Sequence, residues 1–289
     1  MAKPIVLVVG SLHYDIMVEA DHLPCRDETA VGRRWYPKFG GKGGNQAVSC
    51  AQQGAETRFL GAIGTDDFGA FLAAGLTRSG VDTRFLRQVA DTGSGISVAV
   101  QDAAGDYAAT IVSAANLAID PGWLAVSDVW DGVGLLVLQN EIPEAVNLAA
   151  ATEARRRGVR TLLNAAPVRP LSDAFCQMID ILVVNAVEAE MMGADPVHSL
   201  PSAAAAAGRL ATRAPSVIVT AGSKGLAAFV PDGTAWTVPA EPVRVLSSHG
   251  AGDAFIGALS AALVAGRPMR DATLAASHAA ALHVSGQAD

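Results

Sequence analysis

Residues 250–259 read Gly-Ala-Gly-Asp-Ala-Phe-Ile-Gly-Ala-Leu, a glycine turn that leads directly into an apolar run. Gly250 and Gly252 let the backbone bend and bring main-chain N–H groups close to a ligand. The start of a helix adds unpaired N–H donors and a partial positive charge, which together suit an anion such as phosphate. The stretch therefore predicts an anion-binding turn at the beginning of a helix, formed by Gly250, Ala251 and Gly252.

Asp253 is the acidic residue of this turn, and two interpretations of it are open. A carboxylate would repel a phosphate, so it is better placed to accept the proton of a hydroxyl group that attacks the phosphate. The simpler interpretation is that Asp253 is a helix N-cap, a position where aspartate is common. The first interpretation predicts a catalytic base, and the second predicts only a local stabilising contact.

The composition indicates a globular enzyme that acts on small molecules. The chain has 289 residues, 51% of them hydrophobic and 17% charged, and its formal net charge is −7. These values fit a large buried sheet and do not fit a disordered chain. An acidic chain of this kind is not expected to bind nucleic acid through a broad basic face. Any basic residues that bind an anionic substrate must therefore be local.

The N-terminus and the cysteines predict a cytoplasmic protein. The first apolar run, residues 5–9, is too short for a signal-peptide core or a membrane span. The three cysteines, Cys25, Cys50 and Cys176, match no zinc or redox motif. We therefore expect reduced thiols and no association with a membrane.

Residues 40–47 read Gly-Gly-Lys-Gly-Gly-Asn-Gln-Ala and form a second glycine cluster. Glycines at this density permit a ligand to approach the backbone closely, and Asn45 is expected to begin a helix. The cluster is not a Walker loop, because Tyr36 occupies the place of that motif's first glycine and no Ser or Thr follows Lys42. A flexible loop remains the alternative.

Apolar runs alternate with helix-like segments along most of the chain. Runs such as residues 5–9 and 181–184 indicate strands that are buried on both faces. Residues 12–37 and 85–113, approximately, differ because short alternating segments and the turn at 102–106 predict hairpins. We therefore predict an α/β fold in a single domain, residues 1–289. It has a doubly wound, mainly parallel sheet flanked by helices and a small β-sheet lid.

Polar side chains follow several of the predicted strands. Because ligands of open α/β sheets sit at the carboxyl ends of strands, these side chains are expected to share one edge. Two glycine-rich turns and one carboxylate at that edge suggest phosphoryl transfer to a hydroxyl group. The side chains are those of Asp15, Asn164, Asn185, Glu188, Thr220 and Asp253.

Together these motifs resemble the ribokinase-like (PfkB) carbohydrate kinase family, and its ribokinases most. Residues 40–47 are similar to the family's first signature, and residues 250–253 to its second. Residues 185–188, Asn-Ala-Val-Glu, match its NxxE element, and residues 220–222 resemble its nucleotide-contacting turn. The resemblance runs from Gly10 to about Val284. It implies ATP-dependent phosphorylation of a sugar hydroxymethyl group, and often a homodimer formed through the lid.

The resemblance also implies roles for individual residues. Asp253 would be the catalytic base, with Gly250, Ala251 and Gly252 as its anion hole. Glu188 would act on Mg²⁺ through water, which suits an ion that dehydrates reluctantly. The expected ATP contacts are Asn185, Thr220, Gly222 and Gly252. The expected sugar contacts are His13, Asp15, Gly41, Lys42, Asn45 and Glu141.

Two departures from the family pattern matter. Ribokinases usually carry Asp-Thr-Thr before the second glycine turn, where this chain has Ser247, Ser248 and His249. Ser247 removes a charge from the monovalent-cation site, which puts K⁺ activation in question. His249 can supply a positive group there or act as a neutral polar substitute. His13 stands where ribokinases have an asparagine on the sugar, so the substrate is not necessarily ribose.

Three other functions remain open from sequence. A nucleoside or sugar-acid kinase of the same fold is favoured if His13 and the lid accept a base or a carboxylate. A non-catalytic sugar- or nucleotide-binding regulator is favoured by the changed residues 247–249 and disfavoured by the retained Asp253, Lys42 and Asn45. A nicotinamide dehydrogenase is disfavoured because the chain has no dinucleotide fingerprint.

Overall fold

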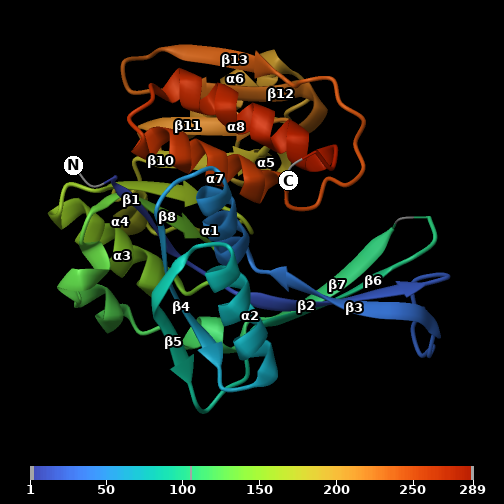
Figure 1. The fold of residues 1–289 in the computed structure, drawn as a ribbon. Coiled ribbons are helices and arrows are strands. Elements are labelled where there is room, and N and C mark those ends of the chain that lie inside the picture. Colours follow the sequence, from blue (N-terminus) through green and yellow to red (C-terminus); the bar gives the residue numbers. More distant parts are fainter. Residues whose placement is uncertain (1–2, 105, 288–289) are drawn as a thin grey trace.

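A computed structural model describes residues 3–104 and 106–287, and within them two sheets form. The larger sheet has nine strands in the order β13-β12-β11-β10-β9-β8-β1-β4-β5 (Figure 1). All neighbours are parallel except the pairs β11–β12 and β12–β13. The strands are β1 (Ile5–Val9), β4 (Thr57–Gly64), β5 (Asp82–Val89), β8 (Val133–Gln139), β9 (Arg160–Asn164), β10 (Ile181–Asn185), β11 (Ser216–Thr220), β12 (Gly225–Phe229) and β13 (Ala235–Pro239).

Helices cover both faces of the large sheet, as predicted. Strand β1 shows why, because Leu7 and Val9 pack into one core and Val6 and Val8 into the other. One face is covered by α1 (Lys42–Gln52), α2 (Asp67–Arg78), α7 (Ala251–Val264) and α8 (Met269–Val284). The other is covered by α3 (Glu144–Arg156), α4 (Asp173–Cys176), α5 (Ala186–Met191), α6 (Leu200–Leu210) and the 3₁₀ helices at Ala114–Ala118, Pro121–Ala125 and Ser127–Trp130.

The smaller sheet has the order β3-β2-β6-β7 and projects from the body of the molecule (Figure 1). Strands β6 and β7 pair antiparallel, as the predicted hairpin requires, and Gly105 of its expected turn lies outside the described residues. The expected boundary at residue 85 is wrong, because β5 pairs with β4 in the large sheet and the side chain of Phe85 is buried in its core. The strands are β2 (His13–Ala20), β3 (Gly32–Gly40), β6 (Ile96–Gln101) and β7 (Tyr107–Val112).

Helix α1 begins at Lys42, three residues before the predicted start at Asn45. Gly41 precedes the helix with a φ of 86°, a conformation that favours glycine. Gly43 and Gly44 lie inside the first turn, where a Cβ on Gly43 would be 2.5 Å from the backbone nitrogen of Ser11. The glycines are therefore a packing requirement of an ordered helix start, and the flexible-loop alternative is wrong.

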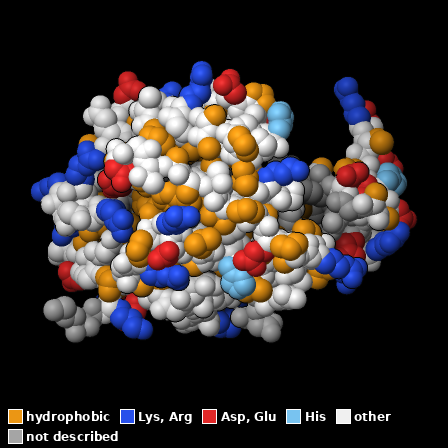
Figure 2. Space-filling model, turned by 90° about the horizontal axis from the view of Figure 1, so that it is seen from above, with side chains coloured by type: hydrophobic (Ala, Val, Ile, Leu, Met, Phe, Trp, Pro, Cys, Tyr) orange, Lys and Arg blue, Asp and Glu red, His pale blue; other side chains and the backbone are white. Residues whose placement is uncertain are grey.

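Two surface properties bear on possible partners: the distribution of charge and the hydrophobicity of the helices. Figure 2 shows basic and acidic side chains interspersed over the face that it presents. Within the described part of the chain, no helix combines the length and the hydrophobicity that a membrane span needs.

The contact between α1 and α7 is close because α7 carries a glycine at the crossing. A Cβ on Gly257 would lie 2.1 Å from Ser49 Oγ, 2.3 Å from Ser49 Cβ and 2.7 Å from the Ser49 carbonyl carbon. Because one of these atoms belongs to the backbone, a Cβ at this position would force one helix to shift. The crossing brings the first turn of α1 beside the first turn of α7.

We expect Gly257→Ala to destabilise the protein by about 1–3 kcal/mol, the usual cost of overpacking a core. Gly208→Ala is the matched control, because Gly208 is also helical but nothing lies within 4 Å of a Cβ placed on it. The control should gain roughly 0.5–1 kcal/mol from alanine's better helix propensity. Urea unfolding measures both free energies, and equal effects would contradict the packing argument.

Candidate active site

The first turn of α7 holds the carboxylate of Asp253 inside the protein. Gly250 is the N-cap, with a left-handed φ of 85°, and Asp253 is the third residue of the helix. The N-cap interpretation of Asp253 is therefore wrong. Only 8% of Asp253 is exposed, so its carboxylate lies largely out of water in the first turn of the helix, where the Ala251 nitrogen donates to the Ser248 carbonyl oxygen at 3.3 Å.

Two amide side chains of α1 hold the Asp253 carboxylate. Asn45 donates from Nδ2 to Oδ2 at 3.1 Å, and Gln46 donates from Nε2 to Oδ1 at 2.9 Å. Gln46 Nε2 also donates to Asn164 Oδ1 at 3.0 Å at the end of β9. Asn45 was expected in the site, whereas Gln46 was not. These contacts orient the carboxylate from two sides.

Burial is the largest influence on the ionisation of Asp253. It raises the pKa of that carboxyl above its usual range, against the lowering effects of the Lys42 charge and of the bonds from Gln46 and Asn45. A carboxylate with a raised pKa is a stronger proton acceptor than a solvated aspartate. The environment therefore suits a general base.

A second acidic group, Glu141, lies close to the same helix start. Its Oε2 accepts hydrogen bonds from Ser11 Oγ at 2.5 Å and from the backbone nitrogen of Lys42 at 2.8 Å. His13 Nδ1 is 3.8 Å from the same oxygen. Burial lowers the pKa of His13, against the raising effect of Glu141, which favours the neutral imidazole. Ser11 lies just beyond the carboxyl end of β1.

Asp15 completes the acidic side of the site. It is 8% exposed, and a Cβ on Gly40 would lie 2.1 Å from its Oδ2, so β3 must carry glycine at that point. Burial raises the pKa of Asp15 to about 7; Lys38 opposes the rise and Glu141 adds to it. Lys38 on β3 thus supplies a positive charge that the sequence argument did not identify.

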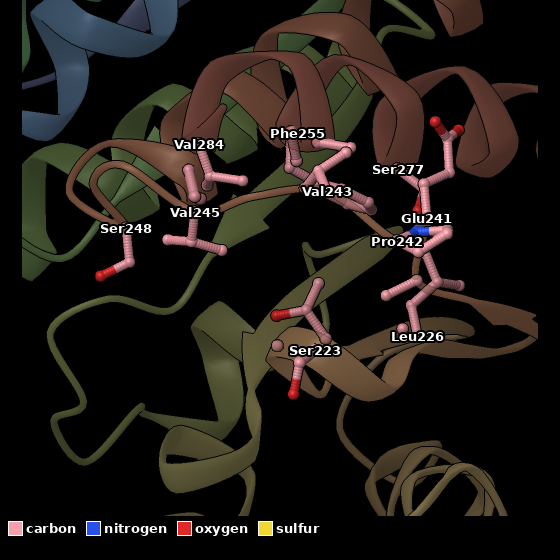
Figure 3. Close-up of a pocket in the computed structure, with 18 residues that line it drawn as sticks. Ser223, Leu226, Glu241, Pro242, Val243, Val245, Ser248, Phe255, Ser277 and Val284 are labelled. Atoms are coloured by element: carbon pink, nitrogen blue, oxygen red, sulfur yellow. The ribbon is translucent and has the colours of Figure 1, made fainter. Parts of the chain in front are cut away.

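A pocket of about 450 Å³ lies on the other side of the α7 turn (Figure 3). Thr220, Gly222 and Gly252, three of the four expected ATP contacts, line it. Its walls are otherwise largely apolar, as is usual for the site of a flat organic ligand. They include Leu226, Pro242, Val243, Val245, Phe255 and Val284.

Asn185 and Glu188 contact each other in a capping box at the start of α5. Asn185 Oδ1 accepts from the Glu188 nitrogen, and Glu188 Oε2 accepts from the Asn185 nitrogen, both at 2.8 Å. Burial raises the pKa of Glu188, with Lys42 lowering it and Asp253 raising it. Glu188 is therefore close enough to the turn at residues 250–253 for the charges of Lys42 and Asp253 to shift its pKa. Asn185 does not line the 450 Å³ pocket.

Residues 247–249 form a turn that bonds mostly to itself and to α8. Ser247 Oγ accepts from the His249 nitrogen at 3.2 Å. The His249 carbonyl oxygen lies 2.9 Å from His283 Nε2, within hydrogen-bond distance. Partial burial lowers the pKa of the His249 imidazole, and Lys38, Lys42 and His283 lower it further. These influences favour the neutral form of His249.

Known proteins similar to this chain include several ribokinases. The chain is 34% identical over 263 residues to the ribokinase of Mus musculus, covering 88% of this chain and 80% of that protein. It is 30% identical over 280 residues to the ribokinase of Bacillus subtilis, covering 96% and 92%. The structure of Arabidopsis thaliana ribokinase complexed with ribose and ATP matches it with a TM-score of 0.90 at 30% identity, covering 98% of this chain and 93% of that one.

The family model described as pfkB family carbohydrate kinase matches residues 3–288. The large mainly parallel sheet, the small projecting sheet and the order of the two glycine-rich turns agree with that match. The chain belongs to the pfkB family of carbohydrate kinases.

Proposed function

We propose that the protein is an ATP-dependent sugar kinase that phosphorylates a hydroxymethyl group of ribose or a related sugar. The observation that carries the proposal is the Asp253 carboxylate, buried at the start of α7 and held by Asn45 and Gln46. Its neighbours Ala251 and Gly252 line the largely apolar pocket, and the charge of Glu141 acts on its carboxyl group. A base between a nucleotide pocket and a hydroxyl-binding cluster is what phosphoryl transfer to an alcohol needs.

In the proposed step, the hydroxymethyl oxygen forms a bond to the γ-phosphorus of ATP, and the bond from that phosphorus to the β–γ bridging oxygen breaks. ADP leaves, and the hydroxyl proton passes to the Asp253 carboxylate. The partial positive charge at the start of α7 and the N–H groups of Gly252 and Asp253 would stabilise the developing charge on the transferred phosphoryl group. The Ala251 nitrogen already donates to the Ser248 carbonyl oxygen at 3.3 Å.

The remaining assignments follow from where the side chains lie. Thr220, Gly222 and Gly252 would contact ATP, with Asn185 at the edge of the same region. The sugar hydroxyls would bond to acceptors and donors beyond Asp253. These are His13, Asp15, Gly41, Lys42, Asn45 and Glu141.

Glu188 fits a role with Mg²⁺ through water. One of its oxygens caps α5, and its carboxylate lies within the electrostatic reach of Asp253 and Lys42. Among the described residues, no group of three or more His, Cys, Asp or Glu side chains is arranged to hold a metal. Mg²⁺ typically keeps several waters and binds substrate phosphates. When bound it would neutralise charge on the phosphates.

A homodimer formed through the small sheet and a cytoplasmic location complete the proposal. The sheet exposes large apolar side chains, including 63% of Trp35, 37% of Tyr36 and 52% of Ile111. Exposed apolar groups gathered on one element favour association. A second copy of the chain is the partner that the family resemblance implies.

Asp253→Asn should keep ATP and sugar binding but lower kcat by about 10²–10⁴-fold, the usual contribution of a positioned base. Asp271→Asn is the control, because Asp271 is also in the first turn of a helix but is exposed. A coupled assay of ADP release with ribose measures kcat for both. A variant rate equal to that of the unaltered protein would remove Asp253 from its role, and a screen with no turnover of any acceptor would favour the regulator.

The affinity for the sugar should fall as pH drops below about 7. The pKa of Asp15 is about 7, so below that pH the carboxyl gains a proton and loses its capacity to accept bonds from sugar hydroxyls on both oxygens. We expect KM to rise toward pH 6 while kcat is governed separately by Asp253. Asp15→Asn should flatten the KM profile, and an unchanged profile would contradict this assignment.

Activity should be insensitive to K⁺. Ser247 is uncharged and bonds to the His249 nitrogen, and the His249 carbonyl oxygen is within hydrogen-bond distance of His283. Initial rates in buffers with K⁺ and with tetramethylammonium, at equal ionic strength, should agree within error. Strong activation by K⁺ would refute the inference.

A further inference from the structure

The side chain of Gln46 is completely buried where α1 meets α7 and the end of β9. Its Nε2 donates to Asp253 Oδ1 at 2.9 Å and to Asn164 Oδ1 at 3.0 Å. An amide nitrogen carries two hydrogens, so both are in use. Gln46 Oε1, in contrast, has no hydrogen-bond partner among the described residues. The amide is therefore oriented by two neighbours that both need a donor.

A backbone carbonyl group determines the orientation of both amides. Asn164 Nδ2 donates to the Val183 carbonyl oxygen of β10 at 3.3 Å. Because a carbonyl oxygen can only accept, Asn164 must turn its Nδ2 toward Val183 and its Oδ1 toward Gln46. Gln46 must then present its Nε2, since the opposite orientation would place its oxygen against the oxygens of Asn164 and Asp253. We call Asn164 and Gln46 in this arrangement the amide relay.

The amide relay ends at Asp253, whose Oδ1 must be an acceptor. Asn45 Nδ2 donates to the other oxygen, Oδ2, at 3.1 Å. Hydrogen bonds donated to both oxygens favour the ionised form of a carboxyl group, whereas burial favours the neutral form. A neutral Asp253 could not take a proton from a hydroxyl group, so the relay maintains the form that the proposed reaction needs.

The two oxygens of Asp253 are not equivalent. Oδ1 faces Gln46, which is completely buried, and Gln46 in turn contacts the buried Asn164. Oδ2 faces Asn45, which is only partly buried and is one of the expected sugar contacts. A hydroxyl group can therefore approach Oδ2 and not Oδ1.

We propose that Gln46 and Asn164 are positioning residues that keep Asp253 ionised and leave its Oδ2 as the oxygen that accepts the hydroxyl proton. Asn164 acts through Gln46 and does not contact Asp253 in the hydrogen bonds of this structure. The inference rests on the proposed kinase function for the proton transfer but not for the ionisation of Asp253.

Three charged groups also act on Asp253. Lys42 lowers the pKa of its carboxyl group and Glu141 raises it. Glu188 is the third, because its own pKa is raised by the charge of Asp253 and the repulsion is mutual. All three remain in place when Gln46 or Asn164 is replaced, so a change in the titration of Asp253 would report on the amide relay.

Gln46→Met and Asn164→Leu test the proposal by direct titration. Methionine is similar in length to glutamine but donates no hydrogen bond, so the pKa of Asp253 should rise by about 1–2 pH units, as for loss of a hydrogen bond to a charged group. Asn164→Leu should give a smaller rise, because Gln46 keeps its amide but loses the group that orients it. Carbon-13 NMR of protein labelled at the aspartate carboxyl carbon measures both, and Asp253→Asn identifies the resonance.

The ADP-release assay provides a second readout. A base acts in its ionised form, so kcat is lost as the pH falls through its pKa, and a higher pKa moves this loss to higher pH. In both variants the acid limb of the kcat profile should shift in the same direction as the NMR titration, with KM for ATP and for ribose unchanged. A merely structural role would instead lower kcat equally at every pH.

Asn147→Leu is the matched control. Asn147 is completely buried on α3, and its Nδ2 donates to the Gln139 carbonyl oxygen at 2.8 Å. The substitution removes a buried bond from an amide to the backbone, as Asn164→Leu does, but the lost bond does not involve Gln46 or Asp253. It should leave the titration of Asp253 and the acid limb of kcat unchanged. Thermal unfolding establishes which variants fold, and Asn164→Leu carries the test if Gln46→Met does not.

The two readouts separate this proposal from the kinase function. A raised pKa of Asp253 in the relay variants, without turnover of any acceptor by the unaltered protein, supports the relay and refutes the kinase function. Turnover with an unchanged titration of Asp253 in the relay variants overturns the relay and leaves the kinase function intact. An equal shift in Asn147→Leu also overturns the relay.

Discussion

The pair of hydrogen bonds that Asn45 and Gln46 of α1 donate to the Asp253 carboxylate is the interaction on which the rest of the site depends. It exists because α1 and α7 cross at Gly257, where any side chain would meet Ser49. The same crossing places Lys42, at the start of α1, near enough to lower the pKa of Asp253. A glycine on one helix thus determines both the position and the ionisation of a side chain one turn away on the same helix.

The lysine charges near Asp253 explain how an acidic protein can bind an anionic substrate. Lys42 and Lys38 are local positive charges in a chain whose net charge is −7. The partial positive charge at the start of α7 adds to them. The acidic groups Asp15 and Glu141 belong instead to the proposed sugar cluster, where sugar hydroxyls would need hydrogen-bond acceptors. Because these groups are partly buried, the field of each charge is stronger than it would be in water. The positive groups and the acidic groups can therefore act on different parts of the substrates.

The small sheet has a place in this arrangement beyond that of a cover. Strands β2 and β3 carry His13, Asp15 and Lys38 to the proposed sugar cluster. In the proposed function, the acceptor would lie between α1, whose amides hold Asp253, and the small sheet, which carries His13 and Asp15. Substrate selection can change in this fold without disturbance of the phosphoryl-transfer turn.

The sequence by itself determined the alternation of strands and helices, the small sheet and the importance of Asp253, because apolar periodicity and glycine turns are local signals. It did not reveal Gln46 or Lys38, since each acquires its role from residues far away in the chain. Only the tertiary structure decided that Gly43 and Gly44 begin a helix, because the close contact with Ser11 overrides their poor helix propensity. It also decided that Gly250, not Asp253, caps α7, which leaves the carboxylate free for chemistry.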